Sequence, residues 1–410
     1  MMVAVSGPLA PVTEAGRAAW RLASTHADAF AALAGDRDRR GAFDPAAVAE
    51  MRASGFGGSC VPLSCGGLGV DQLRDVMALA CRLGRGDGSL ALVAQMHLSG
   101  TWGLSRAAAN GLGGPGLGPL LHRFATGDAW LSAAVTEAGT NYFHPATRLQ
   151  ARGEGWLLEG TKVFATGSPA ATHLTTNARV VGGPFDGRLA TVVVPADRTG
   201  VEVIDDWDGL GMRASGSGQV RFRQCALGPE TIVLPAGPFG RFTAAALQGR
   251  AFGNVGNVSV MLGIAEAARD LAVGRARRDG RVSSLPLVER ATVRHGLAEL
   301  EVDLLTARDV LARLGERADD LARAPSDDLE VAHRFMADFQ AAKLAVNRLS
   351  AAVVDRALTL GGGAAYAGSH AIARLVRDVR AGQFMQPFSP HEALGYVGAV
   401  VAGIEPDVEA

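Results

Sequence analysis

Hydrophobic and polar positions change their spacing twice along the chain. Over residues 13–124, alanine-rich segments repeat at the spacing of a helix, and Asp44-Pro45 has the form of an N-cap followed by a first-turn proline. Over residues 129–235 the apolar runs become short, rich in β-branched residues and separated by glycine, proline and aspartate. The alternation in VRFRQ and ATVVVP predicts strands of an antiparallel barrel or sandwich.

The helical spacing returns after about residue 242 and continues almost to the C-terminus. We therefore predict an α+β chain of three domains: an N-terminal helical domain (1–126), a central antiparallel β domain (127–238) and a C-terminal helical bundle (239–410). Two apolar stripes with three-and-four spacing are expected in the core of the antiparallel bundle. They are Leu297, Leu300, Leu304, Leu311 and Leu314, and Val331, Phe335, Phe339, Ala342, Val346, Leu349 and Val353.

The composition argues against several classes of function. Lysine plus arginine number 40 against 41 for aspartate plus glutamate in 410 residues, so we expect no nucleic-acid or anionic membrane partner. The N-terminus lacks a basic stretch before an apolar core, and no apolar run approaches the ~20 residues that cross a bilayer, so we expect a cytoplasmic protein. Four cysteines are too few for a disulfide framework, and Cys60 and Cys65 have no nearby histidine, so no metal is expected.

Two segments stand out because glycines and polar groups interrupt apolar structure. VTEAGTNYFHPATR, residues 135–148, follows a predicted strand and offers hydroxyl and amide groups to a planar polar ligand, although an ordinary connection has the same composition. In LTLGGGAAYAG, residues 358–368, three glycines follow a helix. They allow close approach of a ligand or another chain, but a helix C-cap also needs one of them. The segment lacks the G-x-G-x-x-G pattern, so a Rossmann fold is disfavoured.

Two histidines are candidates for acid–base chemistry. His97 lies on an apolar helical segment, where a hydrogen-bonded core histidine is the alternative interpretation. His391 stands between Pro390 and Glu392 in RDVRAGQFMQPFSPHEA, residues 377–393, where the prolines restrain the backbone and the carboxylate could orient the ring. A plain surface loop is the alternative. The chain has no G-x-S-x-G, H-E-x-x-H or Walker A pattern, which leaves hydrolase and nucleotide triphosphatase functions without support.

Taken in order, several segments resemble the acyl-CoA dehydrogenase superfamily of flavoproteins, from about residue 40 to residue 385. They are VPLSCGGLGVD, VTEAG, GWLLEGTKVFATG, DWDGLGMRASGSGQVRF, ALTLGGGAAY and ARLVRDVRAG. The resemblance implies an N-terminal helical domain, a central β domain and a C-terminal four-helix bundle, with a flavin at their junction. It also implies FAD as the cofactor, with FMN as the alternative, and commonly a homotetramer.

The resemblance assigns residues to the flavin ring. Thr136 and Phe164-Ala165-Thr166 would lie against the isoalloxazine, and Thr140 near the phosphate side of the cofactor. Hydroxyl and backbone N–H groups can hydrogen-bond the polar edge of the ring, while Phe164 can cover one face.

Other contacts are implied across a subunit boundary. Gly362 and Gly363 match a glycine pair that passes close to the cofactor of a neighbouring subunit, so we expect a dimer or tetramer. Arg278, in RARRDGRVSS, matches the phosphate-pairing arginine of the family only approximately. Thr359 and Ala365 replace a glutamine and a glycine that are usual there, which indicates a differently held adenine end.

The largest departure is at Gln386. Counting onward from RDVRAG, this residue takes the position of the catalytic glutamate, and Pro387-Phe388 follows where Gly-Thr is usual. An amide cannot remove the α-proton of an acyl thioester, a step in which a general base is worth roughly 10²–10⁴ in rate. The second base position of the family falls in GRAFGNVGNVS, where Gly253, Asn254 and Asn257 stand and no carboxylate occurs. A shift of a few residues would bring Glu392 into play.

These departures favour a flavin-dependent oxidoreductase that uses oxygen, as the monooxygenase branch of the superfamily does without the glutamate. His391 or His97 would then exchange a proton near the flavin. The alternatives are an acyl-CoA or acyl-carrier-protein dehydrogenase with a displaced base, and a non-catalytic flavoprotein scaffold, against which the intact flavin-contacting residues argue. A small hydrophobic or carrier-tethered substrate and a flavin reductase are the expected partners.

Overall fold

The first third of the chain forms a layer of helices. The computed structural model describes residues 9–278 and 286–407. Its first helices are α1 (Glu14–Arg40), α2 (Pro45–Ala53), α3 (Leu73–Gly86), α4 (Gly88–Ala109) and α5 (Leu117–Ala125). As predicted, Asp44 caps α2 by accepting a hydrogen bond from the Ala46 N–H, with Pro45 in the first turn.

The middle of the chain folds into one sheet. Its strands are β1 (Leu131–Ala133), β2 (Arg148–Arg152), β3 (Gly155–Lys162), β4 (His173–Val181), β5 (Arg188–Pro195), β6 (Val201–Ile204), β7 (Gln219–Leu227) and β8 (Val233–Pro238). The order is β6-β7-β3-β2-β4-β5-β8, with β1 paired to β4. The predicted β domain is confirmed, but the sheet is mixed, because β1/β4 and β2/β4 are parallel. Alternation along one strand carries no information about the direction of its neighbour.

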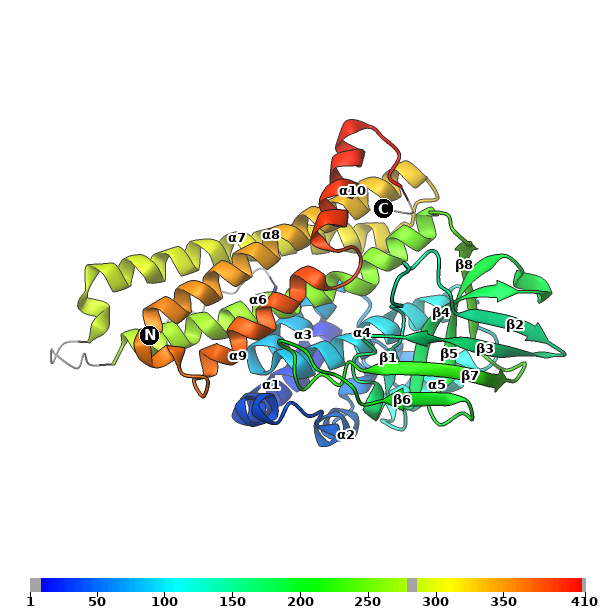
Figure 1. Ribbon diagram of the computed structural model, residues 1–410, viewed down its shortest axis with the longest axis horizontal. Helices are drawn as coiled ribbons and strands as arrows, with labels where there is room; N and C mark the ends of the chain where they lie inside the picture. Colours follow the sequence, from blue (N-terminus) through cyan, green and yellow to red (C-terminus); the bar gives the residue numbers. More distant parts are fainter. Residues whose placement is uncertain (1–8, 279–285, 408–410) are drawn as a thin grey trace.

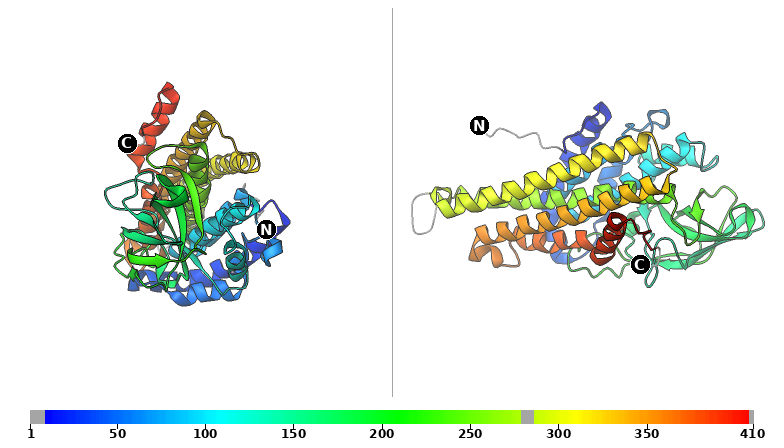
Figure 2. Two further views of the ribbon diagram at one scale, coloured as in Figure 1. Left: turned by 90° about the vertical axis from the view of Figure 1, so that its right-hand side faces the viewer. Right: turned by 90° about the horizontal axis from the view of Figure 1, so that it is seen from above.

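Long helices form the remainder of the chain. Helices α6 (Ala244–Ala276), α7 (Ala291–Arg323) and α8 (Leu329–Gly361) run side by side, followed by α9 (Ala371–Asp378) and α10 (Pro390–Ala402) (Figure 1). Short 3-10 turns include Gly363–Tyr366 after α8 and Val379–Phe384 after α9. The sheet packs at one end of the bundle (Figure 2). Because α6 contacts both α3 and α8, it joins the N-terminal layer to the bundle.

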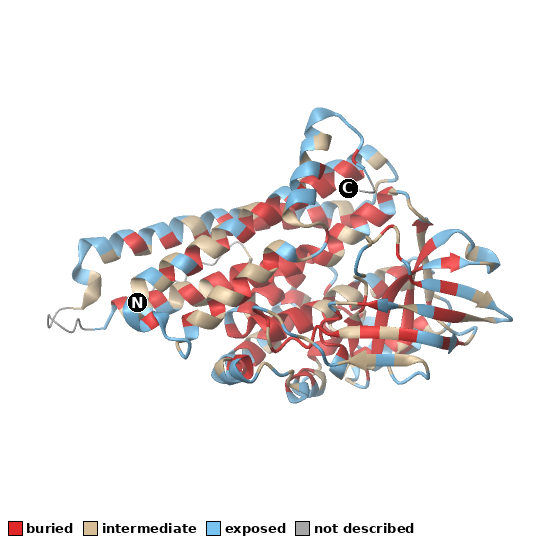
Figure 3. Ribbon diagram, viewed as in Figure 1, coloured by how far each residue is buried: buried red, intermediate tan, exposed pale blue. Residues whose placement is uncertain are grey.

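Buried residues, red in Figure 3, run through the junction of these parts. One hydrophobic cluster includes side chains of the N-terminal helices together with α6, α7, α8 and α9, and a second cluster lies within the sheet. The predicted stripes of α7 and α8 face the first cluster, except that Val331 is 39% exposed. Within the described residues, no helix is long and apolar enough to cross a membrane.

The element boundaries fall close to the predicted domain limits. Helix α5 ends at Ala125 and β1 begins at Leu131, while β8 ends at Pro238 and α6 begins at Ala244. The N-terminal helices and the bundle nevertheless share one hydrophobic cluster. The two helical regions therefore stabilise each other through a common core.

Candidate active site

A cavity of about 840 Å³ lies where the sheet, the N-terminal helices and the bundle meet. Its walls come from α4, strands β1, β4, β5 and β8, the loops after β1 and β3, the segment between β6 and β7, α6, and residues 377–386. A volume of this order suits a medium-sized organic ligand. Among the described residues, its charged lining side chains are Arg250, Arg377 and Arg380, and neither a carboxylate nor a histidine lines it.

The loop after β1 forms part of the wall. Thr136 lines the cavity, and the next residue, Glu137, forms a buried ion pair with Lys162, with Oε1 and Nζ 2.5 Å apart. Lys162 also donates to the backbone and side-chain oxygens of Asn177, each over 2.8 Å. Burial lowers the pKa of Lys162 to about 8, although Glu137 opposes this shift. Glu137 Oε2 accepts a hydrogen bond from the Ala146 N–H, so the pair ties the far side of the loop to β3.

Two aromatic side chains form a second part of the wall. Phe164 has a φ of 56°, in the left-handed region, and remains 60% exposed. Its ring meets that of Trp207 edge to face, with 6.1 Å between the centroids. Thr166 Oγ1 lies 2.9 Å from Ser217 Oγ, and both residues also line the cavity. An exposed aromatic ring on an unfavourable backbone beside a cavity is typical of a surface that a ligand covers.

A third part of the wall surrounds Arg250, in the second turn of α6. Its guanidinium lies 4.1 Å from the centroid of the Tyr142 ring, and its Nη2 donates to Gln386 Oε1 over 2.7 Å. Burial lowers the pKa of Arg250. In the part of the chain that the structure describes, no carboxylate lies within ion-pairing distance of Arg250. This arginine therefore carries an unpaired charge at the cavity wall.

Residues 385–388 form an elbow that carries Gln386, and Lys343 of α8 holds this elbow against the bundle. Lys343 Nζ donates to the carbonyl oxygens of Phe388 at 2.6 Å and Pro387 at 3.1 Å, and also to that of Met385. Burial, together with the charge of Arg250, lowers the pKa of Lys343 to about 7. The backbone on both sides of Gln386 is thus fixed by one buried side chain.

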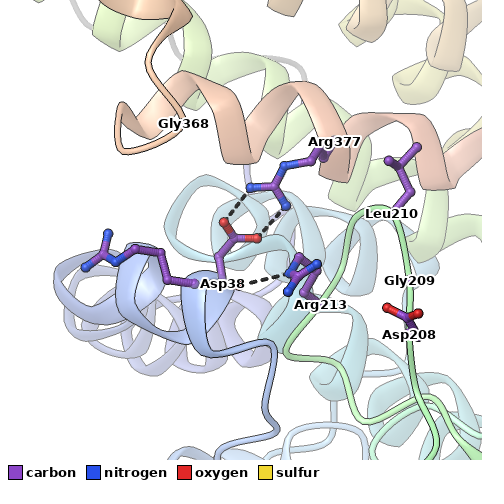
Figure 4. A pocket seen from close by; sticks show the side chains of 8 residues that line it. Asp38, Asp208, Gly209, Leu210, Arg213, Gly368 and Arg377 are labelled. Atoms are coloured by element: carbon purple, nitrogen blue, oxygen red, sulfur yellow. Dashed lines mark hydrogen bonds and ion pairs between the residues drawn. The ribbon is translucent and has the colours of Figure 1, made fainter.

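The other two arginines of the cavity wall have carboxylate partners. Arg377 donates from both Nη atoms to Asp38 of α1, over 2.7 and 2.5 Å, and Arg213 Nε reaches the Asp38 carbonyl (Figure 4). Arg380 Nη2 lies 2.5 Å from Asp355 Oδ1. The charges of Arg377 and Arg380 are therefore compensated by carboxylates of the chain itself.

His97 lies in the core and outside the cavity lining. Its side chain is fully buried and stacks on Trp130 at 4.0 Å between centroids. Its Nδ1 accepts from the Leu131 N–H over 2.9 Å, so Nε2 carries the proton that is donated to the Gly57 carbonyl at 2.8 Å. Burial lowers its pKa to about 4. This geometry matches the core histidine that the sequence left as the alternative, and a catalytic role of His97 stays a prediction.

His391 is exposed in the first turn of α10 and does not line the cavity. Glu392 forms a capping box with Ser389, whose N–H donates to Glu392 Oε2 over 2.5 Å, and Pro390 occupies the first helical position. Glu392 is therefore engaged in capping α10, which corrects the expectation that it orients the His391 ring. Pro390 and Glu392 of this segment therefore serve to begin a helix.

The remaining predicted cofactor residues lie outside the cavity lining. Thr140 Oγ1 donates to the His144 carbonyl within its own loop. Arg278 is exposed just beyond α6, and Gly362 and Gly363 are exposed at the end of α8. Both helices end away from the sheet (Figure 1). These three residues could contact a flavin only in a neighbouring subunit, and that assignment stays a prediction.

Three residues of the site were missed in the sequence. Arg250 is the second residue of GRAFGNVGNVS, a segment in which only a carboxylate was expected to matter. Trp207 lies in DWDGLGM, which served only the family resemblance. Lys343 follows Ala342 within the apolar stripe of α8, and a lysine at a core position was the available signal.

Models of the acyl-CoA dehydrogenase family match all three regions of the chain. The N-terminal domain matches residues 17–110, the middle domain residues 132–225 and the C-terminal domain residues 255–390. The chain therefore belongs to the acyl-CoA dehydrogenase family, and the predicted fold is confirmed. It is a flavin-dependent enzyme of the oxidoreductase class.

Within this family, the chain is similar to amino sugar nitrososynthases. It is 37% identical over 404 residues to L-evernosamine nitrososynthase of Micromonospora sp., which covers 97% of this chain and 93% of the relative. It is 36% identical to amino sugar nitrososynthase DnmZ of Streptomyces peucetius, over 98% of this chain and 97% of the relative. The X-ray structure of KijD3 with FMN and dTDP-3-amino-2,3,6-trideoxy-4-keto-3-methyl-D-glucose gives a TM-score of 0.90 at 35% identity, covering 98% and 97%.

The residues of the cavity fit a flavin. Thr136, Phe164 and Thr166, which are expected against the ring, all lie in the lining. Thr176 Oγ1 and Asn257 Oδ1 are buried lining atoms without a hydrogen-bond partner in the described chain, so they are available to a bound ligand. A bound flavin supplies two-electron chemistry and, when reduced, reaction with dioxygen, while the protein positions the reactants.

Proposed function

We propose that the protein is a flavin-dependent oxygenase that converts the amino group of a nucleotide-linked amino sugar into a nitroso group. One observation carries this proposal. In the described residues no carboxylate lines the cavity. This agrees with the similarity of the chain to amino sugar nitrososynthases over almost its whole length.

The missing carboxylate separates this reaction from acyl-thioester dehydrogenation. Removal of a proton from carbon requires a base beside the flavin. An amine instead reacts through its own nitrogen lone pair, so no carboxylate is needed for attack on an electrophilic oxygen. Gln386 lines this cavity, and the family resemblance assigns it to the position of the usual glutamate; a neutral amide there agrees with this chemistry.

The reaction consumes two molecules of dioxygen. In the first step R–NH2, O2, two electrons and two protons give R–NHOH and one water. In the second, R–NHOH, O2, two electrons and two protons give R–N=O and two waters. The electrons come from a reduced nicotinamide through a flavin reductase, which is the expected partner. FMN and FAD are both candidates for the flavin.

The protein residues have three tasks in this scheme. Thr136, Phe164 and Thr166 would hold the ring, with Trp207 packed edge to face on Phe164. The apolar lining contributed by α4 and β8 would exclude water and so limit the wasteful release of peroxide. Arg250 and Gln386 would contact the polar substrate.

The test combines purified protein with FMN or FAD, a flavin reductase, a reduced nicotinamide, air and a dTDP-linked 3-amino sugar. We expect mass spectrometry to detect the hydroxylamine first and the nitroso sugar later, with one oxygen atom incorporated from labelled dioxygen. Anaerobic mixing of the flavin-loaded protein with acyl-CoAs should leave the flavin oxidised. Rapid flavin bleaching by acyl-CoAs without conversion of the amino sugar would refute the proposal.

A further inference from the structure

The geometry points to Arg250 as the residue that binds the anionic diphosphate of the substrate. The nature of the substrate rests on the proposed function, whereas the choice of residue rests on the contacts of three arginines.

Arg250 is distinguished from the other cations of the cavity wall by its partners. Arg377 donates from both Nη atoms to Asp38, and Arg380 pairs with Asp355 at 2.5 Å. Arg250 contacts a neutral amide and an aromatic face, and the described residues place no carboxylate within ion-pairing distance of it. A partly buried cation without an anion is unfavourable until a ligand supplies one.

The surroundings of Arg250 hold the guanidinium ready for a planar anion. The Tyr142 ring supports one face at 4.1 Å, and Gln386 accepts a hydrogen bond over 2.7 Å. Lys343 in turn fixes the backbone on both sides of Gln386. Because a guanidinium has five N–H donors, the amide leaves others free, and their fork matches two phosphate oxygens.

The charge of the whole neighbourhood agrees with a dianionic group. Lys343 lies close enough for the charge of Arg250 to lower its pKa, so a second basic side chain, cationic below about pH 7, shares this region. Glu392 acts on Lys343 in the opposite direction, but it is bound to the N–H of Ser389. A diphosphate would therefore meet a positive potential in a cavity whose lining contains no carboxylate.

Two sources could supply a phosphate here, the substrate and the flavin itself, and the binding experiment separates them. Calorimetry would measure the dissociation constants of dTDP, thymidine and FMN for wild type, Arg250→Gln and Arg250→Lys. The control Arg241→Gln removes an exposed arginine just before α6 and changes the net charge equally.

For Arg250→Gln we expect dTDP to bind about tenfold more weakly or worse, because a charge-assisted, forked contact is lost. Arg250→Lys should recover part of the affinity, since it keeps the charge and loses the fork. Thymidine and FMN should bind each of these variants within about twofold of wild type, as should dTDP for Arg241→Gln. A purely structural role would weaken thymidine and dTDP alike.

Each other outcome decides the question. Equal dTDP affinity in wild type and Arg250→Gln would overturn the inference and leave the proposed function standing. Loss of FMN affinity without loss of dTDP affinity would assign Arg250 to the cofactor. Binding of dTDP that depends on Arg250, without oxidation of any dTDP-linked amino sugar, would keep this inference and remove the proposed function. Wild-type protein that does not bind dTDP would overturn both.

Discussion

The ammonium of Lys343 and the carbonyl oxygen of Phe388 lie 2.6 Å apart, which ties the buried face of α8 to the elbow that carries Gln386. Lys343 is only 2% exposed and lies within an otherwise apolar stripe. Its Nζ also donates to the carbonyl oxygens of Met385 and Pro387, the residues before and after Gln386. The position of Gln386, and through it that of Arg250, therefore depends on a cation in the core of the bundle.

Replacing Lys343 by Met should change how stability depends on pH. The folded-state pKa of Lys343 is about 7, below its ordinary value of 10.5, so between these values the unfolded chain binds the additional proton. Wild-type stability should therefore rise with pH through this window, by at most about 1.4 kcal/mol per pH unit, and the variant should lack this contribution. Urea unfolding of both proteins at about pH 7 and about pH 9 measures the difference. Parallel pH profiles would mean that Lys343 is not the group that titrates.

Replacing His97 by Asn should lower stability without changing the chemistry. The Leu131 N–H and the Gly57 carbonyl would lose their partners in a fully buried site, at a cost of about 2–4 kcal/mol. Its folded pKa of about 4 lies below 6.5, so the contribution of His97 is complete above about pH 6.5 and is lost as the pH falls toward 4. Unfolding curves and turnover per flavin-loaded molecule separate the two effects. A large fall in turnover at unchanged stability would restore His97 as a catalytic candidate.

Replacing His391 by Ala should leave turnover within about twofold of wild type. The side chain is exposed outside the cavity lining, and a general acid or base would instead contribute roughly 10²–10⁴. Steady-state rates and melting temperatures check this. Glu392→Ala is the matched variant, since it removes the capping box of α10 and should lower stability by about 1 kcal/mol. A hundredfold loss of turnover in His391→Ala would place this histidine at a flavin after all.

The three regions of the fold could be predicted because the spacing of apolar residues in the sequence follows the spacing of buried positions in each helix and strand. Helical stripes and alternating strands record which side of each element meets the core, and Asp44-Pro45 marks a helix start in local chemistry. Parallel pairing of β2 with β4 depends on where the chain returns, which no local pattern contains. The shared core of the helical regions escaped prediction for the same reason.

Part of the cavity lining follows from recognisable segments of the sequence, and part depends on packing between distant segments. Thr136, Phe164 and Thr166 come from recognisable stretches and do line one cavity. The contact between Arg250 and Gln386 joins residues that are 136 positions apart. His97 and His391 were candidates because histidine can exchange protons near neutral pH. The structure shows that His97 is buried in the core and that His391 is exposed outside the cavity, which the residue type alone did not indicate.

Replacing Glu137 by Gln should weaken flavin binding through the loop that carries Thr136. Lys162 would remain in a buried site without its anion, and breaking such a pair typically costs about 3–5 kcal/mol. We expect a lower free energy of unfolding and a higher dissociation constant for FMN, measured by fluorescence titration. Glu159→Gln, an exposed glutamate on the same strand as Lys162, is the control and should bind FMN as wild type does. An unchanged FMN affinity in Glu137→Gln would separate Thr136 from the cofactor.

Replacing Gln386 by Glu tests what governs the part of the cavity around Arg250. Burial alone would raise the pKa of the new carboxyl, but Arg250, whose Nη2 lies 2.7 Å from Gln386 Oε1, would lower it and form an ion pair. The carboxylate would then occupy the arginine and repel a diphosphate. We expect dTDP to bind about tenfold more weakly, and acyl-CoAs still to leave the flavin oxidised under anaerobic conditions. The neutral variant Gln386→Met keeps the charge of Arg250 free, so its dTDP affinity should stay within about threefold of wild type. Flavin bleaching by acyl-CoAs in Gln386→Glu would show instead that a carboxylate at this position suffices as a base.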